Sequence, residues 1–358
     1  MEIPGSTKKY FTTQLTAWHN TANNRSLPWK NEKDPYKIWL SEVILQQTRA
    51  LQGLPYYLNF IESFPTVADM AAAKDEQAFR LWQGLGYYNR CKNMLASARY
   101  IAKDLGGVFP GSYEGLLQLK GIGPYTAAAI ASFAYGLPHA VVDGNVYRVL
   151  ARYFGIDTPF DTTTGKKEFS TLAQQLLDCK NSAAYNQAIM DLGAIVCTPR
   201  NPLCGECPLQ KKCIAYHHDL TGILPVRSKK QSVRKRYFHY LLLKWKDTIW
   251  IQKRTNSDIW ENLHEPYLIE TPEPLEPGEL LQHKQFKKEN FIYDSLIFSG
   301  KSSQRLTHQI IEARFYSINL TKKPKISNPN GVWISKKELE KTAFPKTVVS
   351  FLENNLYF

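Results

Sequence analysis

The sequence lacks any apolar run long enough to span a membrane, and its first residues carry neither the basic flank nor the apolar segment of a secretory signal. We therefore expect a cytoplasmic protein with no membrane partner. Acidic residues are also scarce, because 32 Asp and Glu face 45 Lys and Arg, giving a net charge of +13. This excess favours a polyanionic partner such as nucleic acid, and in that case a nucleoid-associated protein; a soluble protein that is merely basic is the alternative.

Cysteines are few, and four of the six lie in the segment 197–213, separated by six, two and five residues. In a reducing compartment such a group indicates metal ligation rather than disulfide bonds. Structural zinc sites usually use paired CxxC motifs, and only one CxxC occurs here. The compact loop therefore favours a 4Fe-4S cluster that holds the loop in shape. The predicted ligands are Cys197, Cys204, Cys207 and Cys213.

The periodicity of apolar residues changes near residue 220. Helical patterns dominate residues 7–216, whereas the later sequence has the alternation and aromatic content of β-strands. We expect a helical domain at 1–219, a basic linker at 220–236 and an α+β domain at 237–358. Helices are predicted at 36–47, 75–81, 92–105, 113–119, 125–135, 144–154, 166–179, 183–196, 336–341 and 347–356, and strands at 237–245, 248–253, 291–298 and 306–319.

A turn rich in glycine lies between two of these helices, at residues 119–127 (LKGIGPYTA). Gly121 and Gly123 allow a tight turn and close approach of a ligand to the backbone. Pro124 then begins a helix whose free N–H groups favour an anion, for which a DNA phosphate is the natural candidate. Such turns also serve as plain helix connections, so the flanking helices and the downstream segment 141–146 carry the specificity of this motif.

Glu42 lies within an apolar helical stretch, where the side chains three and four positions away include Ile38, Trp39 and Leu45. Apolar surroundings disfavour the charged form and raise the pKa of a carboxyl group, which suits a general acid near neutral pH. A glutamate that faces solvent on a surface helix is the alternative.

Asp143 follows two valines and precedes a predicted helix, so its simplest role is an N-cap. Backbone N–H groups at a cap favour the ionised carboxylate. An ionised carboxylate can also stabilise the cationic sugar that forms when a purine is removed, as in glycoside hydrolysis. The two roles are compatible.

Five segments together resemble the adenine DNA glycosylase (MutY) family of the endonuclease III, or helix-hairpin-helix, superfamily. They are residues 39–48 (WLSEVILQQT), 84–88 (GLGYY), the turn at 119–127, residues 142–146 (VDGNV) and the four cysteines. The resemblance covers about residues 8–216 closely and the C-terminal part more loosely. It implies an all-α helix-hairpin-helix glycosylase domain with an iron–sulfur loop, followed by an α+β Nudix-like domain. It also implies a monomer that acts on double-stranded DNA with adenine opposite 8-oxoguanine or guanine.

Tyr125 occupies the position where bifunctional relatives such as endonuclease III carry a lysine. A lysine amine attacks the sugar and cleaves the strand through a Schiff base, whereas a tyrosine cannot form one. We therefore expect a monofunctional enzyme that leaves an abasic site.

The resemblance assigns roles to the remaining residues. Glu42 would protonate adenine at N7 and later activate water, and Asp143 would stabilise the oxocarbenium ion or form a transient adduct. Asn145 and Tyr125 would orient these groups. The expected base pocket contains Arg25, Leu27, Trp29 and Gln187, the last replacing a glutamate found in many relatives. The expected DNA contacts, which include filling the stack around a flipped base, are Gln47, Leu85, Tyr87, Lys120, Gly121 and Gly123. A monovalent cation at the turn is a further candidate ligand.

The C-terminal part resembles the Nudix-like domain of this family but lacks the closely spaced glutamates that bind magnesium, so nucleoside triphosphate hydrolysis is not expected. In its loop 306–308, Thr307 and His308 would inspect the oxidised guanine; an ordinary strand start is the alternative. Three other functions are alternatives. A glycosylase for thymine opposite guanine conflicts with Glu42 and the extra domain, a DNA-binding scaffold leaves Glu42 and Asp143 unexplained, and a Nudix hydrolase lacks its metal box.

Overall fold

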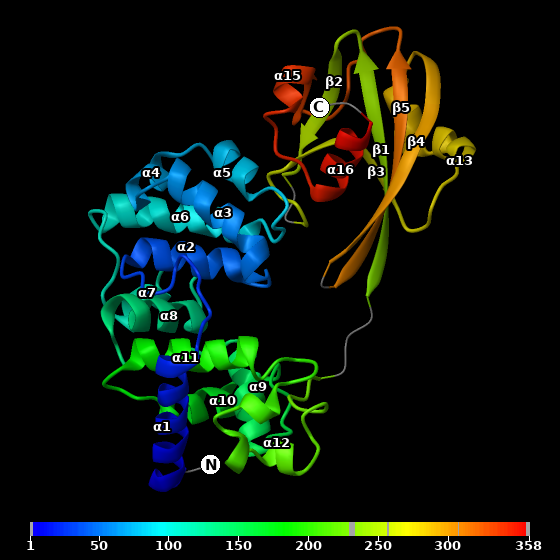
Figure 1. Cartoon of the computed structure of the whole chain (residues 1–358). Helices are drawn as coiled ribbons and strands as arrows, with labels where there is room; N and C mark the ends of the chain where they lie inside the picture. Colours follow the sequence, from blue (N-terminus) through cyan, green and yellow to red (C-terminus); the bar gives the residue numbers. More distant parts are fainter. Residues whose placement is uncertain (1–2, 229–232, 256–257, 307, 356–358) are drawn as a thin grey trace. The chain divides into compact units, whose positions relative to one another are not determined.

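A computed structural model describes residues 3–228, 233–255, 258–306 and 308–355 (Figure 1). The chain divides into two compact units, one of residues 1–72 and 93–229 and the other of residues 73–92 and 230–358. The two units are therefore not consecutive in the sequence, because residues 73–92, a helical segment of the N-terminal half, belong to the second unit. Among the described residues, no helix combines the length and apolarity that crossing a bilayer requires.

The N-terminal part of the chain is helical throughout. Its helices are α1 (Gly5–Thr21), α2 (Pro35–Leu45), α3 (Ala50–Ser63), α4 (Val67–Ala72), α5 (Asp75–Trp82), α6 (Asn89–Asp104), α7 (Tyr113–Leu117), α8 (Pro124–Tyr135), α9 (Gly144–Phe154), α10 (Thr163–Leu176), α11 (Ser182–Ile195) and α12 (Ile214–His217), with 3-10 turns η1 (Cys204–Glu206) and η2 (Gln210–Lys212).

Local signals set the ends of these helices. Asp34 caps α2 by accepting a hydrogen bond from the backbone N–H of Tyr36 at 2.9 Å, and Pro35 takes the first helical position. Helix α8 begins at Pro124 and ends at Gly136, a glycine in the left-handed region with φ 67°. The predicted helices are therefore confirmed to within a few residues. In this part of the chain the structure also contains α1, α3, α4 and α12, which lie outside the predicted helical ranges.

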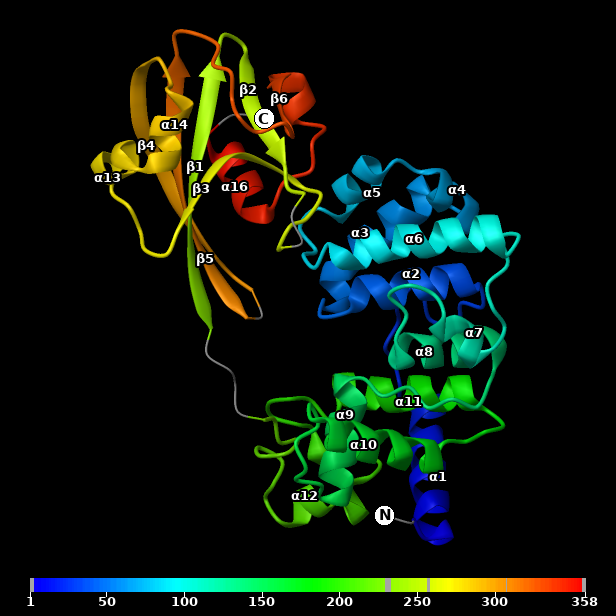
Figure 2. The ribbon, with the colours of Figure 1, turned by 180° about the vertical axis from the view of Figure 1, so that it is seen from behind.

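The helices at the two ends of the first unit share one core. Phe11 and Leu15 of α1 pack with Leu150 of α9, Phe169 of α10 and Leu192 of α11. Figures 1 and 2 show the C-terminal end of α1 meeting α11, with the two helices crossing at a steep angle. This packing brings the loop that follows α1 to the helix α11, about 160 residues later in the chain.

The second unit contains a six-stranded sheet in the order β4-β5-β1-β3-β2-β6. Strands β1 and β5 are parallel, and the other neighbours are antiparallel. The strands are β1 (Arg234–Trp245), β2 (Thr248–Lys253), β3 (His264–Thr271), β4 (Tyr293–Arg305), β5 (Gln309–Leu320) and β6 (Gly331–Ser335), and the helices are α13 (Pro277–Gln282), α14 (Lys284–Glu289), α15 (Lys336–Leu339) and α16 (Lys346–Asn354).

Helices cover both faces of this sheet, as Figures 1 and 2 show for α16 on one side and α13 with α14 on the other. Successive side chains of β5 point to opposite faces. Phe315 stacks on Phe351 of α16 with ring centroids 4.0 Å apart, whereas Tyr316 joins the core that contains Leu280 and Phe286 of α13 and α14. The expected α+β class is confirmed.

The predicted end of the basic linker, residue 236, lies inside the first strand of the second unit. Strand β1 begins at Arg234, and Arg236 is only 9% exposed. Its guanidinium forms ion pairs at 2.7 Å with Asp258 and Glu270, so it is not free to contact phosphate. Strands β3 and β6 were also not predicted. Pro266 lies inside β3, and a proline within an apolar run argues against a strand.

Candidate active site

Glu42 and Tyr125 meet where helices α2 and α8 pack together. Glu42 lies near the end of α2 and is 8% exposed. Tyr125, the second residue of α8, donates a hydrogen bond from its hydroxyl to Glu42 Oε2 at 2.7 Å. A second polar contact joins the same helices, from the Gln46 amide to the Thr126 hydroxyl at 3.4 Å. The solvent-facing alternative for Glu42 is therefore wrong.

Burial raises the pKa of Glu42 to about 7, and the nearby Asp143 charge acts in the same direction. The hydrogen bond from Tyr125 opposes this shift by stabilising the carboxylate. Burial also raises the pKa of Tyr125 well above its ordinary value, so its hydroxyl keeps its proton and remains a donor. A carboxyl group with a pKa near 7 can both give and take a proton at neutral pH.

Asp143 is the N-cap of α9, as the sequence predicted. Its Oδ1 accepts from the backbone N–H groups of Asn145 and Val146, both at 2.8 Å, and its Oδ2 accepts from the Asn145 side-chain amide at 2.7 Å. Nevertheless, burial raises the pKa of Asp143 above its ordinary value, although these bonds and Arg148 oppose the rise. Capping alone predicts a lowered pKa for Asp143, and this prediction is wrong. It leaves out the cost of burying the charge, which raises the pKa.

Arg148 ties this cap to its surroundings. Its guanidinium donates to Asn145 Oδ1 at 2.8 Å and to the backbone oxygen of Cys197 at 2.6 Å. Helix α11 comes very close at the same point, since a Cβ built on Gly193 would lie 2.6 Å from Asn145 Cβ and 2.8 Å from its backbone oxygen. Asn145 is thus held by Arg148 and by the close approach of Gly193. Because the Asn145 side chain donates to Asp143, this also fixes the position of the Asp143 carboxylate.

The turn between α7 and α8 presents its backbone outward. Lys120, Gly121 and Gly123 are exposed. Gly121 has φ 83°, and a Cβ there would lie 2.7 Å from Asn93 Cβ, so both conformation and space require glycine. The Ser97 hydroxyl donates to the Lys120 carbonyl at 2.8 Å and anchors the turn. This arrangement can accept a phosphate at the start of α8.

Two of the predicted base-pocket residues meet at a carboxylate that sequence reasoning missed. Arg25 Nη1 and Gln187 Nε2 both contact Asp191 Oδ1, at 2.7 and 3.1 Å, and Lys30 Nζ contacts Asp191 Oδ2 at 2.7 Å. Asp191 lies one helical turn after Gln187, which was the only signal available in the sequence. Leu27 and Trp29 lie in the loop with Arg25, and Trp29 packs edge-on against Tyr57 at 5.4 Å between ring centroids.

The predicted stack-filling residues differ in exposure. Tyr87 is 48% exposed and Gln47 is exposed, and both adopt positive φ, of 49° and 58°. Leu85 is only 8% exposed. His308 is exposed in the connection between β4 and β5, whereas Thr307 lies outside the described residues.

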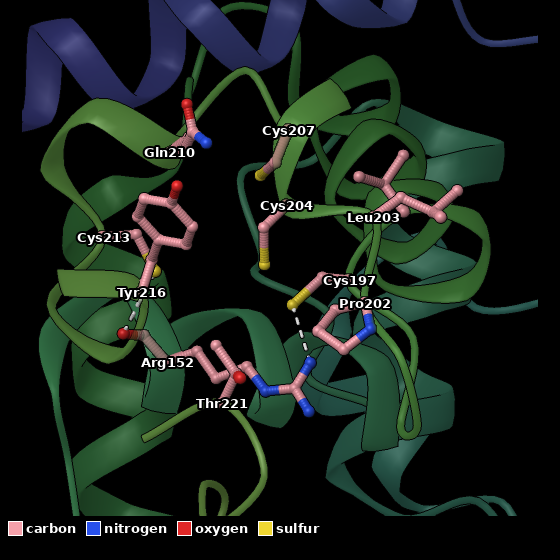
Figure 3. A pocket seen from close by; sticks show the side chains of 11 residues that line it. Arg152, Cys197, Pro202, Leu203, Cys204, Cys207, Gln210, Cys213, Tyr216 and Thr221 are labelled. Atoms are coloured by element: carbon pink, nitrogen blue, oxygen red, sulfur yellow. Dashed lines mark hydrogen bonds between the residues drawn. The ribbon is translucent and has the colours of Figure 1, made fainter. Parts of the chain in front are cut away.

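The four predicted cysteine ligands line one pocket (Figure 3). Arg152 lies beside them and donates from Nη1 to the Cys197 sulfur at 3.3 Å and to the Thr198 carbonyl at 2.8 Å. In the part of the chain that the structure describes, no three His, Cys, Asp or Glu side chains gather closely enough to hold a metal ion. Four cysteine side chains around one pocket fit the iron–sulfur cluster that their spacing predicts, and such a cluster would join the loop to α9, which carries Arg152.

Family comparisons agree with this organisation. Residues 40–177 match the model described as the HhH-GPD superfamily base excision DNA repair protein, residues 197–213 match the iron–sulfur binding domain of endonuclease III, and residues 239–354 match the NUDIX domain. A curated adenine DNA glycosylase of Buchnera aphidicola subsp. Schizaphis graminum is 32% identical over 349 residues, which cover 96% of this chain and 98% of that protein. The chain belongs to the adenine DNA glycosylase family. It is therefore a base excision repair glycosylase that binds DNA and carries an iron–sulfur cluster.

Other similar proteins match a smaller part of the chain, mainly its helical half. The human adenine DNA glycosylase is 42% identical over 214 residues, covering 57% of this chain and 39% of the human protein. A solved thermostable thymine-DNA glycosylase is 30% identical with a TM-score of 0.55, covering 60% of this chain and 98% of that structure. A non-covalent endonuclease III–DNA complex, 19% identical with a TM-score of 0.51 over 61% of this chain and 99% of that one, shows the shared fold.

Proposed function

We propose that this glycosylase hydrolyses the N-glycosidic bond of adenine mispaired with 8-oxoguanine or guanine in double-stranded DNA. The observation that carries the proposal is the buried Glu42, which is hydrogen-bonded to Tyr125 and lies near enough to Asp143 for the charge of Asp143 to raise its pKa. The names of the most similar relatives support adenine as the base. Because the bond to be broken lies inside the duplex, adenine must be flipped out, with Gln47, Leu85 and Tyr87 filling the stack.

In the proposed reaction, the protonated Glu42 gives its proton to N7 of adenine while the bond to the sugar breaks. The electron pair of that bond leaves with the base, and the sugar becomes an oxocarbenium ion. The Asp143 carboxylate, held by Asn145, stabilises this cation or forms a transient adduct. Glu42, now ionised, then takes a proton from the attacking water and returns to its starting state.

The product is an intact strand with an abasic site. Tyr125 has no amine with which to attack the sugar, so the proposal is a monofunctional enzyme. We also propose a monovalent cation at the turn 119–123, where backbone carbonyl oxygens are ligands of the kind that hard cations prefer.

Base release from three duplexes tests the proposal. The duplexes pair adenine with 8-oxoguanine, adenine with guanine, and thymine with guanine, and each product is analysed with and without alkali. The thymine arm is needed because a thymine-DNA glycosylase is among the structural relatives. We expect adenine release and strand breakage only after alkali. Absence of adenine release would refute the main proposal, and breakage without alkali would refute monofunctionality.

The pH dependence should report on Glu42. A general acid acts while protonated, so kcat/KM for adenine should fall as pH rises through about 7, the pKa of Glu42. Tyr125→Phe removes the bond that lowers this pKa, so the alkaline fall should move to higher pH. Tyr135→Phe is the matched control. It removes a hydroxyl from the same helix, but that hydroxyl donates to the Phe109 carbonyl and not to Glu42, so the fall should stay in place. A fall that stays in place, or moves to lower pH, in Tyr125→Phe contradicts the assignment.

His308 should set the preference for the oxidised guanine. Its exposed imidazole lies at the tip between β4 and β5, where it can contact a base edge. His308→Ala should reduce the preference for 8-oxoguanine over guanine opposite adenine by about tenfold, the value of one good base contact. His283→Ala, at the start of α14, is the control and should keep the preference. An unchanged ratio of the two kcat/KM values in His308→Ala would remove His308 from lesion recognition.

A further inference from the structure

Asp191 is the most completely engaged carboxylate near the predicted base pocket. It is fully buried on α11, with 0% of its surface exposed. Its Oδ1 accepts from Arg25 Nη1 at 2.7 Å and from Gln187 Nε2 at 3.1 Å. Its Oδ2 accepts from Asn23 Nδ2 at 2.8 Å and contacts Lys30 Nζ at 2.7 Å. Both oxygens are thus filled by donors from two segments, the loop between α1 and α2 and the helix α11 itself.

This arrangement determines which way the Gln187 amide faces. A carboxylate paired with two cations has only acceptor atoms, so the Gln187 atom beside it must be the amide nitrogen. The reverse orientation would place two acceptor oxygens together in a buried site and lose a hydrogen bond. Gln187 Oε1 therefore points away from Asp191, and among the described residues it has no hydrogen-bond partner.

We propose that Asp191 is a positioning residue that holds Gln187 with its carbonyl oxygen toward the flipped base, and so selects an amine over a carbonyl at position 6 of the purine. An acceptor oxygen pairs with the exocyclic amine of adenine. The same oxygen repels the carbonyl of hypoxanthine, which differs from adenine at this position. This inference rests on the proposed function, because that function places Gln187 at the base.

The substitution Asp191→Asn separates orientation from mere contact. An amide at position 191 can donate as well as accept, so Gln187 becomes free to turn its own nitrogen toward the base. We measure kcat/KM for adenine and for hypoxanthine, each opposite 8-oxoguanine. The adenine-to-hypoxanthine ratio should fall by about tenfold relative to the unmodified enzyme, the value of one hydrogen bond. The ratio is used because Arg25 and Lys30 also lose their partner, which lowers both rates.

The double variant Asp191→Asn, Gln187→Glu is the decisive comparison. A glutamate at 187 offers only acceptors, whichever way it turns, so the adenine preference should return. If the ratio stays low in the double variant, Asp191 acts through Arg25 and Lys30 instead, and the inference is wrong. Asp69→Asn is the matched control and should leave the ratio unchanged, since among the described residues the Asp69 carboxylate accepts hydrogen bonds from the nearby Thr66 alone.

Two readouts keep the result interpretable. Thermal unfolding and duplex affinity show whether each variant is folded. The unmodified enzyme supplies a test that needs no variant, because removal of hypoxanthine as fast as adenine would overturn the inference by itself. If the unmodified enzyme releases neither base, the proposed function fails; if it prefers adenine and Asp191→Asn keeps that preference, only the inference about Asp191 fails.

Discussion

Glu42→Gln should lower the single-turnover rate of adenine release by about 10²- to 10⁴-fold, the contribution typical of a general acid. Glutamine keeps the size of the side chain and can still accept the Tyr125 hydroxyl, so the packing of α2 against α8 is preserved. It cannot give a proton to the leaving base. Burial favours the neutral form of Glu42, so the neutral amide also adds no desolvation cost.

The rate is measured with adenine opposite 8-oxoguanine, and duplex affinity is measured alongside it. Affinity should change little, because the proposed mechanism uses Glu42 in the bond-breaking step. Glu62→Gln, an exposed position on α3, is the matched control. If Glu42→Gln retains more than about a tenth of the rate, another group supplies the proton.

Asp143→Asn should lower the same rate by about 10²- to 10³-fold, the effect of removing one preorganised electrostatic group. Asparagine caps helices as well as aspartate does, so α9 should keep its N-terminus and the fold should keep its stability. The substitution removes the negative charge that, in the proposed mechanism, stabilises the oxocarbenium ion. The variant therefore removes the charge of Asp143 and the bond from the Asn145 side chain, whereas the two backbone hydrogen bonds of the cap can remain.

Asp34→Asn is a closely matched control, because it makes the same chemical change at the N-cap of α2. Both variants should unfold near the temperature of the unmodified protein, and only Asp143→Asn should lose activity. If Asp143→Asn unfolds at a much lower temperature than Asp34→Asn, or if both variants keep their activity, the charge of Asp143 does not have the role proposed for it.

The sequence predicted those parts of the fold and site that depend on neighbouring residues. Caps and periodicity identified α2, α8 and α9, and the apolar neighbours of Glu42 indicated its raised pKa. Errors arose where a local signal misled. Pro266 concealed β3, and the hydrogen bonds at the α9 cap concealed the effect of burial on Asp143.

Contacts between distant residues could not be predicted in this way. Arg25 and Asp191 are 166 residues apart in the chain, and only the packing of α1 against α11 brings them together. Lys30 reaches the same carboxylate from the loop before α2. No sequence pattern marks these partners, because the residues next to each of them in the chain give no sign of a buried ion pair.

The close approach of α11 to α9 at Gly193 has a consequence for judging missense variants. By residue type, Gly193→Ala is a mild change, and an alanine usually strengthens a helix. Here the added methyl group would lie 2.6 Å from Asn145 Cβ and 2.8 Å from its backbone oxygen, and backbone cannot move aside cheaply. We expect this variant to displace Asn145 and with it Asp143, and to lose excision activity before it loses its fold, which rate and unfolding measurements would show. A substitution fifty residues from Asp143, the proposed catalytic aspartate, would then behave as an active-site mutation.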